Sequence, residues 1–381
     1  MRIVNCLLLA TVITAVFAVG GVCAQEATDP PAETEAAAAP AGPATEAYQK
    51  KLAEWKDLLT ELQTLRNDYT KANQEERAEI REKFGKLAEK GEAMREELAQ
   101  SAEKAFIEAP NADKDLTDLL LELTSDNIRR DDYLESLRLA KVLIDNKCDS
   151  KHVYDLAGVA AFAACDFDAA EKYLAMAKEK DALTQMGEMR IASLPKYKKL
   201  WAEETKLREA EAKADDLPRV LLKTNKGDIE LELFENEAPL AVANFVSLVD
   251  KGYSDGLVFH RVLPGFMAQG GCPEGTGTGG PGYNIPCECQ KPEHRKHFIG
   301  SISMAHAGRD TGGSQFFLTF LPTEHLDGRH TVFGRVINGF DVLPKLQRRD
   351  PSRSGGPDPD KIEKATVVRK RDHEYKPTKA E

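Results

Sequence analysis

The sequence predicts a multidomain chain in which an all-α region is followed by a small β-barrel. Apolar residues recur every three or four positions as far as Pro218, and they alternate with polar residues from Arg219 onward. The charge divides at the same place: residues 25–217 hold 29 Lys and Arg against 42 Asp and Glu, a net −13, whereas residues 218–381 hold 22 against 21, a net +1. The acidic half argues against nucleic acid or an anionic membrane as the main partner, because both are bound by basic surfaces.

The first 24 residues have the pattern of a signal peptide. A basic residue precedes the 13-residue apolar run 7–19, and Val22-Cys23-Ala24 supplies small residues for cleavage before Gln25. A membrane anchor is one alternative, although a span needs about 20 apolar residues. A lipoprotein modified at Cys23 is the other. No later segment is long and apolar enough to span a membrane, so we expect a secreted, periplasmic or cell-envelope protein.

A helical hairpin is predicted for residues 46–112, after a disordered linker at residues 25–45 that is rich in proline, alanine and glutamate. Apolar residues follow helical spacing in two stretches that are out of phase with each other. Between the stretches, Asn73 and Glu76 have the spacing of a capping box. A coiled-coil dimer is the alternative, because charged flanks fit both arrangements.

Residues 113–217 contain an internal similarity with a period of 34 residues. Asp132-Tyr133 is matched by Asp166-Phe167, and small residues at Gly158 and Ala161 permit close packing of helices in the second copy. This pattern resembles a degenerate tetratricopeptide (TPR) repeat, which implies stacked antiparallel helix pairs. An irregular helical bundle is the alternative. In both cases the region is expected to bind a protein partner that the sequence does not identify.

From Arg219 the pattern becomes that of strands. Residues 225–228 have the composition of a hairpin turn, and residues 238–251 read as one amphipathic helix. Short apolar segments among many glycines follow, which fits a small barrel or sandwich with long shaped loops.

Three sequence clusters in this half carry the candidate chemistry: FHRVLPGFMAQGG from Phe259, SMAHAG with GSQFF from Ser303, and LDGRHTVFG from Leu326. They supply a cation, two amides and apolar rings, but no arrangement typical of a nucleophile, a phosphate loop or an acid/base pair. In this order and spacing, the clusters resemble the cyclophilin-type peptidyl-prolyl cis-trans isomerases. The resemblance implies an antiparallel eight-stranded β-barrel with two helices at residues 218–371, followed by a tail at 372–381, and neither a cofactor nor a metal.

The resemblance also implies a role for individual residues. Arg261 would be the catalytic guanidinium, Gln269 would hydrogen-bond the substrate backbone, and His330 would close the proline pocket. The substrate-binding residues would be those that line this pocket, its rim and the adjoining groove: Phe266, Met267, Phe317, Leu326, His325, Ala305, His306 and Gln315. Two of them depart from the common family pattern, since His325 stands in place of Trp and His306 in place of Asn. Neither change affects the guanidinium, so activity is still expected.

The five cysteines that follow the signal peptide leave two questions open. Cys148 and Cys165 are expected at opposite ends of one helix, too far apart for a disulfide. Cys272 has two possible disulfide partners, Cys287 and Cys289. A zinc site formed by Cys287, Cys289, His294 and His297 is a further alternative, although its spacing fits no standard finger.

We therefore expect a peptidyl-prolyl isomerase that acts on proline-containing clients outside the cytoplasm. One alternative is a scaffold or chaperone that binds proline peptides and catalyses only incidentally. Another is an assembly adaptor in which the barrel is a passenger.

Overall fold

The computed structural model describes residues 42–352 and 358–380. The predicted signal peptide at 1–24 and the greater part of the predicted linker lie outside these residues. The chain forms two compact units. One extends to Asp126 and includes Arg138–Val153, and the other comprises Asn127–Leu137 together with Tyr154 onward. Within the described residues, no helix is both long and apolar enough to cross a membrane.

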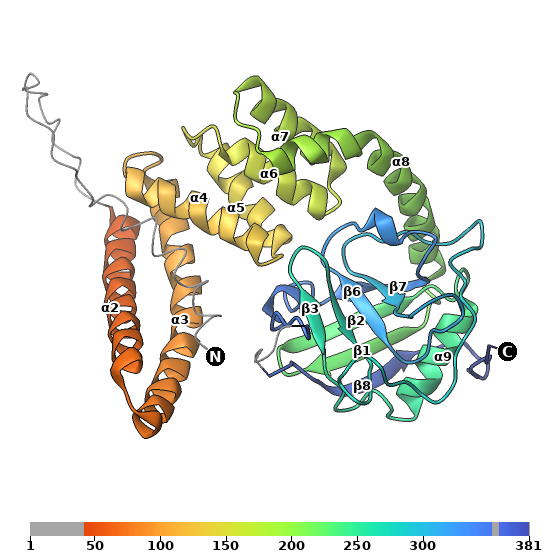
Figure 1. Cartoon of the computed structure of the whole chain (residues 1–381). Coiled ribbons are helices and arrows are strands. Elements are labelled where there is room, and N and C mark those ends of the chain that lie inside the picture. The colour runs from red at the N-terminus through yellow and green to blue at the C-terminus, as the bar shows by residue number, and fades with distance from the viewer. Residues whose placement is uncertain (1–41, 353–357, 381) are drawn as a thin grey trace, which may run out of the picture. The chain divides into compact units, whose positions relative to one another are not determined.

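The first unit contains two antiparallel helices, α2 (Pro43–Lys71) and α3 (Gln74–Glu108), which lie side by side (Figure 1). The predicted capping box is confirmed: the Asn73 side chain accepts from the Glu76 amide, and the Glu76 carboxylate accepts from the Asn73 amide. The linker prediction was wrong at its end, because α2 already begins at Pro43. Proline suits a first helical turn, and the Glu108 carboxylate accepts from the free amides of Ala44 and Thr45 at 3.2 and 3.0 Å.

Four shorter helices follow: α4 (Lys114–Arg129), α5 (Tyr133–Asp145), α6 (Val153–Ala163) and α7 (Phe167–Glu179). The starts of α5 and α7 are separated by the predicted 34 residues. Gly158 explains how closely α6 and α7 pack, since a Cβ atom at this position would lie 2.5 Å from Cγ of Leu174.

The last helix of this region, α8 (Gln185–Ala214), packs against the β-domain within the second unit. The Glu204 carboxylate of α8 forms an ion pair with the buried guanidinium of Arg295, with an N–O distance of 2.8 Å. Glu211 forms an ion pair with Arg335, also at 2.8 Å. The Trp201 ring contacts the Phe298 ring edge to face at 4.7 Å. The helix ends where Asp215 adopts a left-handed conformation with φ 42°, three residues before Pro218.

The predicted eight-stranded antiparallel sheet is confirmed. Its order is β3-β4-β6-β5-β7-β2-β1-β8, and bridges from Val258 to both Cys272 and Lys361 bring its two edges together, so the sheet curls into a barrel. The strands are β1 (Arg219–Thr224), β2 (Gly227–Leu233), β3 (Arg261–Leu263), β4 (Met267–Gly270), β5 (Ser301–Met304), β6 (Phe316–Thr319), β7 (Val332–Asn338) and β8 (Ile362–Arg369).

One α-helix, α9 (Pro239–Asp250), accompanies the sheet (Figure 1). Its Phe245 ring packs in the core against the rings of Phe316 and Phe333, at 5.5 and 5.3 Å. The other helical segments described in this domain are two short 3₁₀ turns, Glu324–Leu326 and Leu343–Lys345. The expected second helix is therefore reduced to 3₁₀ geometry.

The segment predicted as a tail folds back onto the barrel. Tyr375 is buried and donates to Glu235 at 2.9 Å, and the Ala380 amide donates to the Asn284 carbonyl at 2.8 Å. Its end therefore lies beside a loop that borders the candidate site.

The five described cysteines are free thiols. Cys148 and Cys165 flank α6 and are not joined, as their expected separation along a helix predicted, and both are buried. Cys272 accepts a hydrogen bond from the Gly277 amide at 3.3 Å, and neither of the two disulfides considered for it is formed.

Candidate active site

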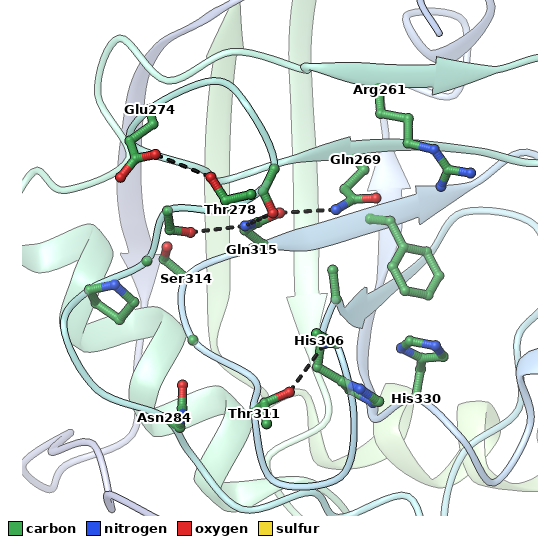
Figure 2. A pocket seen from close by; sticks show the side chains of 18 of the residues that line it. Arg261, Gln269, Glu274, Thr278, Asn284, His306, Thr311, Ser314, Gln315 and His330 are labelled. Atoms are coloured by element: carbon green, nitrogen blue, oxygen red, sulfur yellow. Dashed lines mark hydrogen bonds between the residues drawn. The ribbon is translucent and has the colours of Figure 1, made fainter. Parts of the chain in front are cut away.

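A cavity of about 830 Å³ opens on the barrel beside the β3–β4 hairpin. Nearly all of the predicted site residues lie around it: Arg261, Phe266, Met267, Gln269, Ala305, His306, Gln315, Phe317, Leu326 and His330. They come from β3, β4, β6 and the loops after β5 and before β7, so folding of the sheet brings together residues up to about 70 positions apart in sequence. Figure 2 shows Arg261 beside Gln269, with His306 and His330 across the pocket.

The cationic edge of the cavity is formed by the β3–β4 hairpin. Arg261 is paired with Gln269 across the two strands, which places both side chains on one face. The guanidinium of Arg261 lies 5.9 Å from the centre of the Phe266 ring. Among the residues that the structure describes, no carboxylate forms an ion pair with Arg261. Its charge is therefore available to a ligand in the cavity.

The side-chain amides of Gln269 and Gln315 form a chain of hydrogen bonds along the wall of the cavity. Gln269 Nε2 donates to Gln315 Oε1 at 3.0 Å, and Gln315 Nε2 donates to the carbonyl oxygens of Gly277 and Gly279 at 2.8 and 2.9 Å. The dashed lines in Figure 2 trace this chain. Gln315 thus links β6 to the glycine-rich loop and orients Gln269, whose carbonyl oxygen points to the side of Arg261 in Figure 2.

The apolar part of the cavity is rigidly supported. Met267 and Phe317 are almost fully buried. Behind Phe317 lies the buried His297 ring, stacked at 5.8 Å and held by Asp327 at 2.8 Å and by Ser303 at 3.0 Å. Burial lowers the pKa of His297, although Asp327 opposes this shift. His297 is thus a neutral ring that supports the apolar wall.

Two histidines stack on each other at the opposite side, His306 and His330, with ring centres 4.2 Å apart. His330 Nδ1 bonds the Met304 carbonyl at 3.0 Å, and His306 Nε2 bonds the Arg329 carbonyl at 2.8 Å. Because a carbonyl only accepts, each of these nitrogens carries the proton. Burial, and then the neighbouring histidines, lower the pKa of His330. Both rings therefore offer an acceptor nitrogen when neutral.

His325 is the predicted site residue that does not line the cavity. It lies in the 3₁₀ turn Glu324–Leu326, which directs Leu326 into the cavity, and its ring packs against Phe266 at 5.4 Å. His325 thus contacts the back of a pocket residue.

Sequence reasoning missed the far end of the cavity. The glycine-rich loop, with Glu274, Thr278, Tyr283 and Asn284, lines it together with Thr311 and Ser314. The abundance of glycine after Gly265 signalled a shaped loop but gave no indication of which side chains face the cavity.

The residues of the considered zinc site have other partners. His297 bonds Asp327 and Ser303, and His294 Nδ1 bonds the Lys291 carbonyl at 2.6 Å. Within residues 42–352 and 358–380, no cluster of three or more His, Cys, Asp or Glu has an arrangement that would hold a metal ion.

The comparisons with known proteins agree on one family. The model of the cyclophilin type peptidyl-prolyl cis-trans isomerase/CLD family matches residues 219–367. A peptidyl-prolyl cis-trans isomerase of Helicobacter pylori is 61% identical over 131 residues, which make up 34% of this chain and 80% of the relative. One of Synechococcus elongatus is 60% identical over 136 residues, 35% of this chain and 92% of the relative.

A third relative, peptidyl-prolyl cis-trans isomerase B of Bacillus subtilis, is 56% identical over 122 residues, 32% of this chain and 85% of the relative. Each match covers about a third of this chain but most of the relative. The chain therefore belongs to the cyclophilin family, and its C-terminal β-domain is a cyclophilin-type peptidyl-prolyl cis-trans isomerase.

Proposed function

We propose that Arg261 is the catalytic residue of this isomerase, that its clients are exported polypeptides, and that the acidic helical region binds a protein partner. The observation that supports the catalytic role is the position of an unpaired guanidinium beside Phe266, at the edge of a cavity whose floor is apolar.

The chemistry requires a directed cation and no covalent step. An X-Pro bond rotates slowly because resonance gives its C–N bond partial double-bond character, with a barrier of about 18–20 kcal/mol. When the amide twists, the proline nitrogen becomes pyramidal and gains a lone pair. A guanidinium held near that nitrogen stabilises the twisted amide more than either planar form, which accelerates rotation.

The rest of the site holds the substrate in place. Met267, Phe317 and Leu326 form an apolar pocket of suitable chemistry for a proline ring. The carbonyl of Gln269 is an acceptor for a backbone amide of the client, because the amide nitrogen of this side chain already donates to Gln315. His306 stands in place of the amide found in many relatives; its Nε2 bonds the Arg329 carbonyl, and its Nδ1 is buried without a partner in the described part of the chain.

Replacing Arg261 tests the catalytic proposal. We expect Arg261→Ala to fold normally and to lower kcat/KM for an Ala-Pro peptide by about 10²–10³-fold, because one directed donor to the transition state is lost. Arg261→Lys keeps the charge but lacks the planar donors, so its kcat/KM should lie between those of the wild type and Arg261→Ala. Arg309→Ala removes an exposed arginine outside the cavity and serves as the matched control.

A protease-coupled assay measures the isomerisation rate. Fluorescence measurement of binding of the same peptide distinguishes the enzyme from the scaffold alternative. Wild-type turnover by Arg261→Ala contradicts the catalytic role. Peptide binding by the wild type without rate enhancement supports a scaffold instead.

Export and partner binding rest on the sequence of residues 1–24 and on the net charge of −13 over residues 25–217. We expect the mature protein to begin at Gln25 and to fractionate with the cell envelope or the medium. Cross-linking in that fraction should join a partner to the full-length protein and not to a chain that lacks α2 and α3. An intact N-terminus in the cytosolic fraction contradicts the export proposal.

A further inference from the structure

A carboxylate of the helical region contacts the hairpin that carries the catalytic arginine. Asp131 lies in the turn between α4 and α5, within the same compact unit as the barrel, and is only 5% exposed. Its Oδ1 accepts from the Gly265 amide at 2.7 Å and from the Tyr133 hydroxyl at 3.1 Å. Its Oδ2 accepts from Arg348 at 2.7 Å. These three donors offset part of the cost of burying this carboxylate, and burial still raises the pKa of Asp131 above its usual value.

Gly265 occupies the tip of the β3–β4 turn, directly before Phe266. β3 is the edge strand of the sheet and is only three residues long, so few ladder hydrogen bonds hold the hairpin. The carbonyl of Phe266 accepts from the Phe320 amide at 3.0 Å, which fixes one side of the turn. Asp131 fixes the other side through the Gly265 amide.

The second carboxylate oxygen of Asp131 is linked to the base of the same hairpin through Arg348. Arg348, which it binds, places its guanidinium 4.6 Å from the centre of the Phe320 ring. The next residue, Arg349, exchanges two backbone hydrogen bonds with Val262 at 2.8 and 2.9 Å. Val262 is the neighbour of Arg261. Asp131 therefore restrains both the tip and the base of the element that carries Arg261 and Phe266.

We propose that Asp131 is a positioning residue of the isomerase site, through which the α4–α5 turn holds the β3–β4 hairpin in its catalytic geometry. This inference rests on the proposed role of Arg261. It also implies that the helical region contributes to catalysis, besides any partner that it binds.

Two substitutions separate the hydrogen bond from the backbone geometry. Asp131 has φ +64°, a conformation that Gly and Asn adopt readily and Ala does not. Asp131→Gly keeps this conformation and removes the acceptor. Asp131→Asn keeps the conformation and an oxygen that accepts from Gly265, but its amide nitrogen takes the place of the oxygen that binds Arg348.

In the full chain we expect Asp131→Gly to lower kcat/KM about tenfold, because a small displacement of catalytic groups reduces the rate steeply. The Gly265 amide should exchange its hydrogen faster in this variant. Asp131→Asn should restore slow exchange at Gly265 but only part of kcat/KM, because its amide nitrogen cannot accept from Arg348. Wild-type kcat/KM in Asp131→Gly together with faster exchange at Gly265 overturns the proposal. An Asp131→Asn variant that restores slow exchange at Gly265 and is nevertheless as slow as Asp131→Gly also overturns it.

A matched variant distinguishes positioning from general loss of stability. Glu204 lies on α8, and Glu204→Gln weakens its buried ion pair with Arg295 of the β-domain. This variant should therefore have a lower melting temperature but an unchanged kcat/KM well below that temperature. An equal loss of kcat/KM in Glu204→Gln overturns the positioning role. Arg261→Ala is measured in parallel to test the premise that Arg261 is catalytic. If this variant is as active as the wild type, the proposed function is contradicted, whereas the hydrogen exchange measured at Gly265 is unaffected.

Discussion

Three histidines in and around this site are kept neutral by their surroundings. His297, His330 and His260 all have a pKa that burial lowers from the ordinary value of 6.5. The neighbouring Arg261 guanidinium lowers that of His260 further. Neutral rings matter here because His297 supports Phe317, and His330 stacks on His306 beside the catalytic cavity.

The buried histidines predict how stability depends on pH. Below about pH 6.5 the unfolded chain binds protons at these histidines and the folded chain does not, so the free energy of unfolding decreases as the pH falls. The slope is at most about 1.4 kcal/mol per pH unit for each histidine. His297→Gln should be less stable at pH 7.5, because it loses the stacking on Phe317, but should lose less stability than the wild type between pH 6.5 and 5.5.

Urea unfolding at pH 7.5, 6.5 and 5.5 measures this difference. His152→Gln, at an exposed histidine, should run parallel to the wild type. A His297→Gln variant whose stability falls as steeply as that of the wild type would show that His297 is protonated in the folded protein.

At the level of elements, periodicity predicted most of the fold. The change from helical spacing to alternation located the start of β1, and the turn at residues 225–228 correctly separated β1 from β2. The start of α2 was misplaced because its capping partner, Glu108, lies at the far end of α3, and no local pattern reveals such a contact.

The site was predictable to the extent that its residues are contiguous in the sequence clusters. Arg261, Phe266 and Gln269 fall within one hairpin, and their strand positions determine which face they share. Asp131 was invisible to this reasoning, since 134 residues separate it from Gly265. The direction of His325 also escaped prediction, because it depends on the 3₁₀ geometry of its turn.

At the scale of the whole molecule, the boundary at Pro218 marks a change of secondary structure inside one compact unit. Arg295 is buried against Glu204 and Glu211 of α8, and the same helix covers Phe298. Without α8, the only remaining carboxylate recorded near this guanidinium in the described residues is Glu237, at 3.6 Å. The barrel of this chain thus uses α8 as part of its own surface.

We therefore expect a chain that begins at residue 218 to fold, but to melt about 5–10 °C below a chain that begins at residue 185 and retains α8. The difference corresponds to roughly 2–3 kcal/mol, since 1 kcal/mol shifts the melting temperature by about 2–4 °C for a protein of this size. It arises because removing α8 exposes Phe298 to water and breaks the ion pairs of Arg295. Calorimetry of the two chains measures it. Glu204→Gln in the longer chain should lower its melting temperature by part of this difference, because it weakens one of the ion pairs of Arg295. Equal melting temperatures for the two truncated chains would show that α8 packs on the barrel without stabilising it.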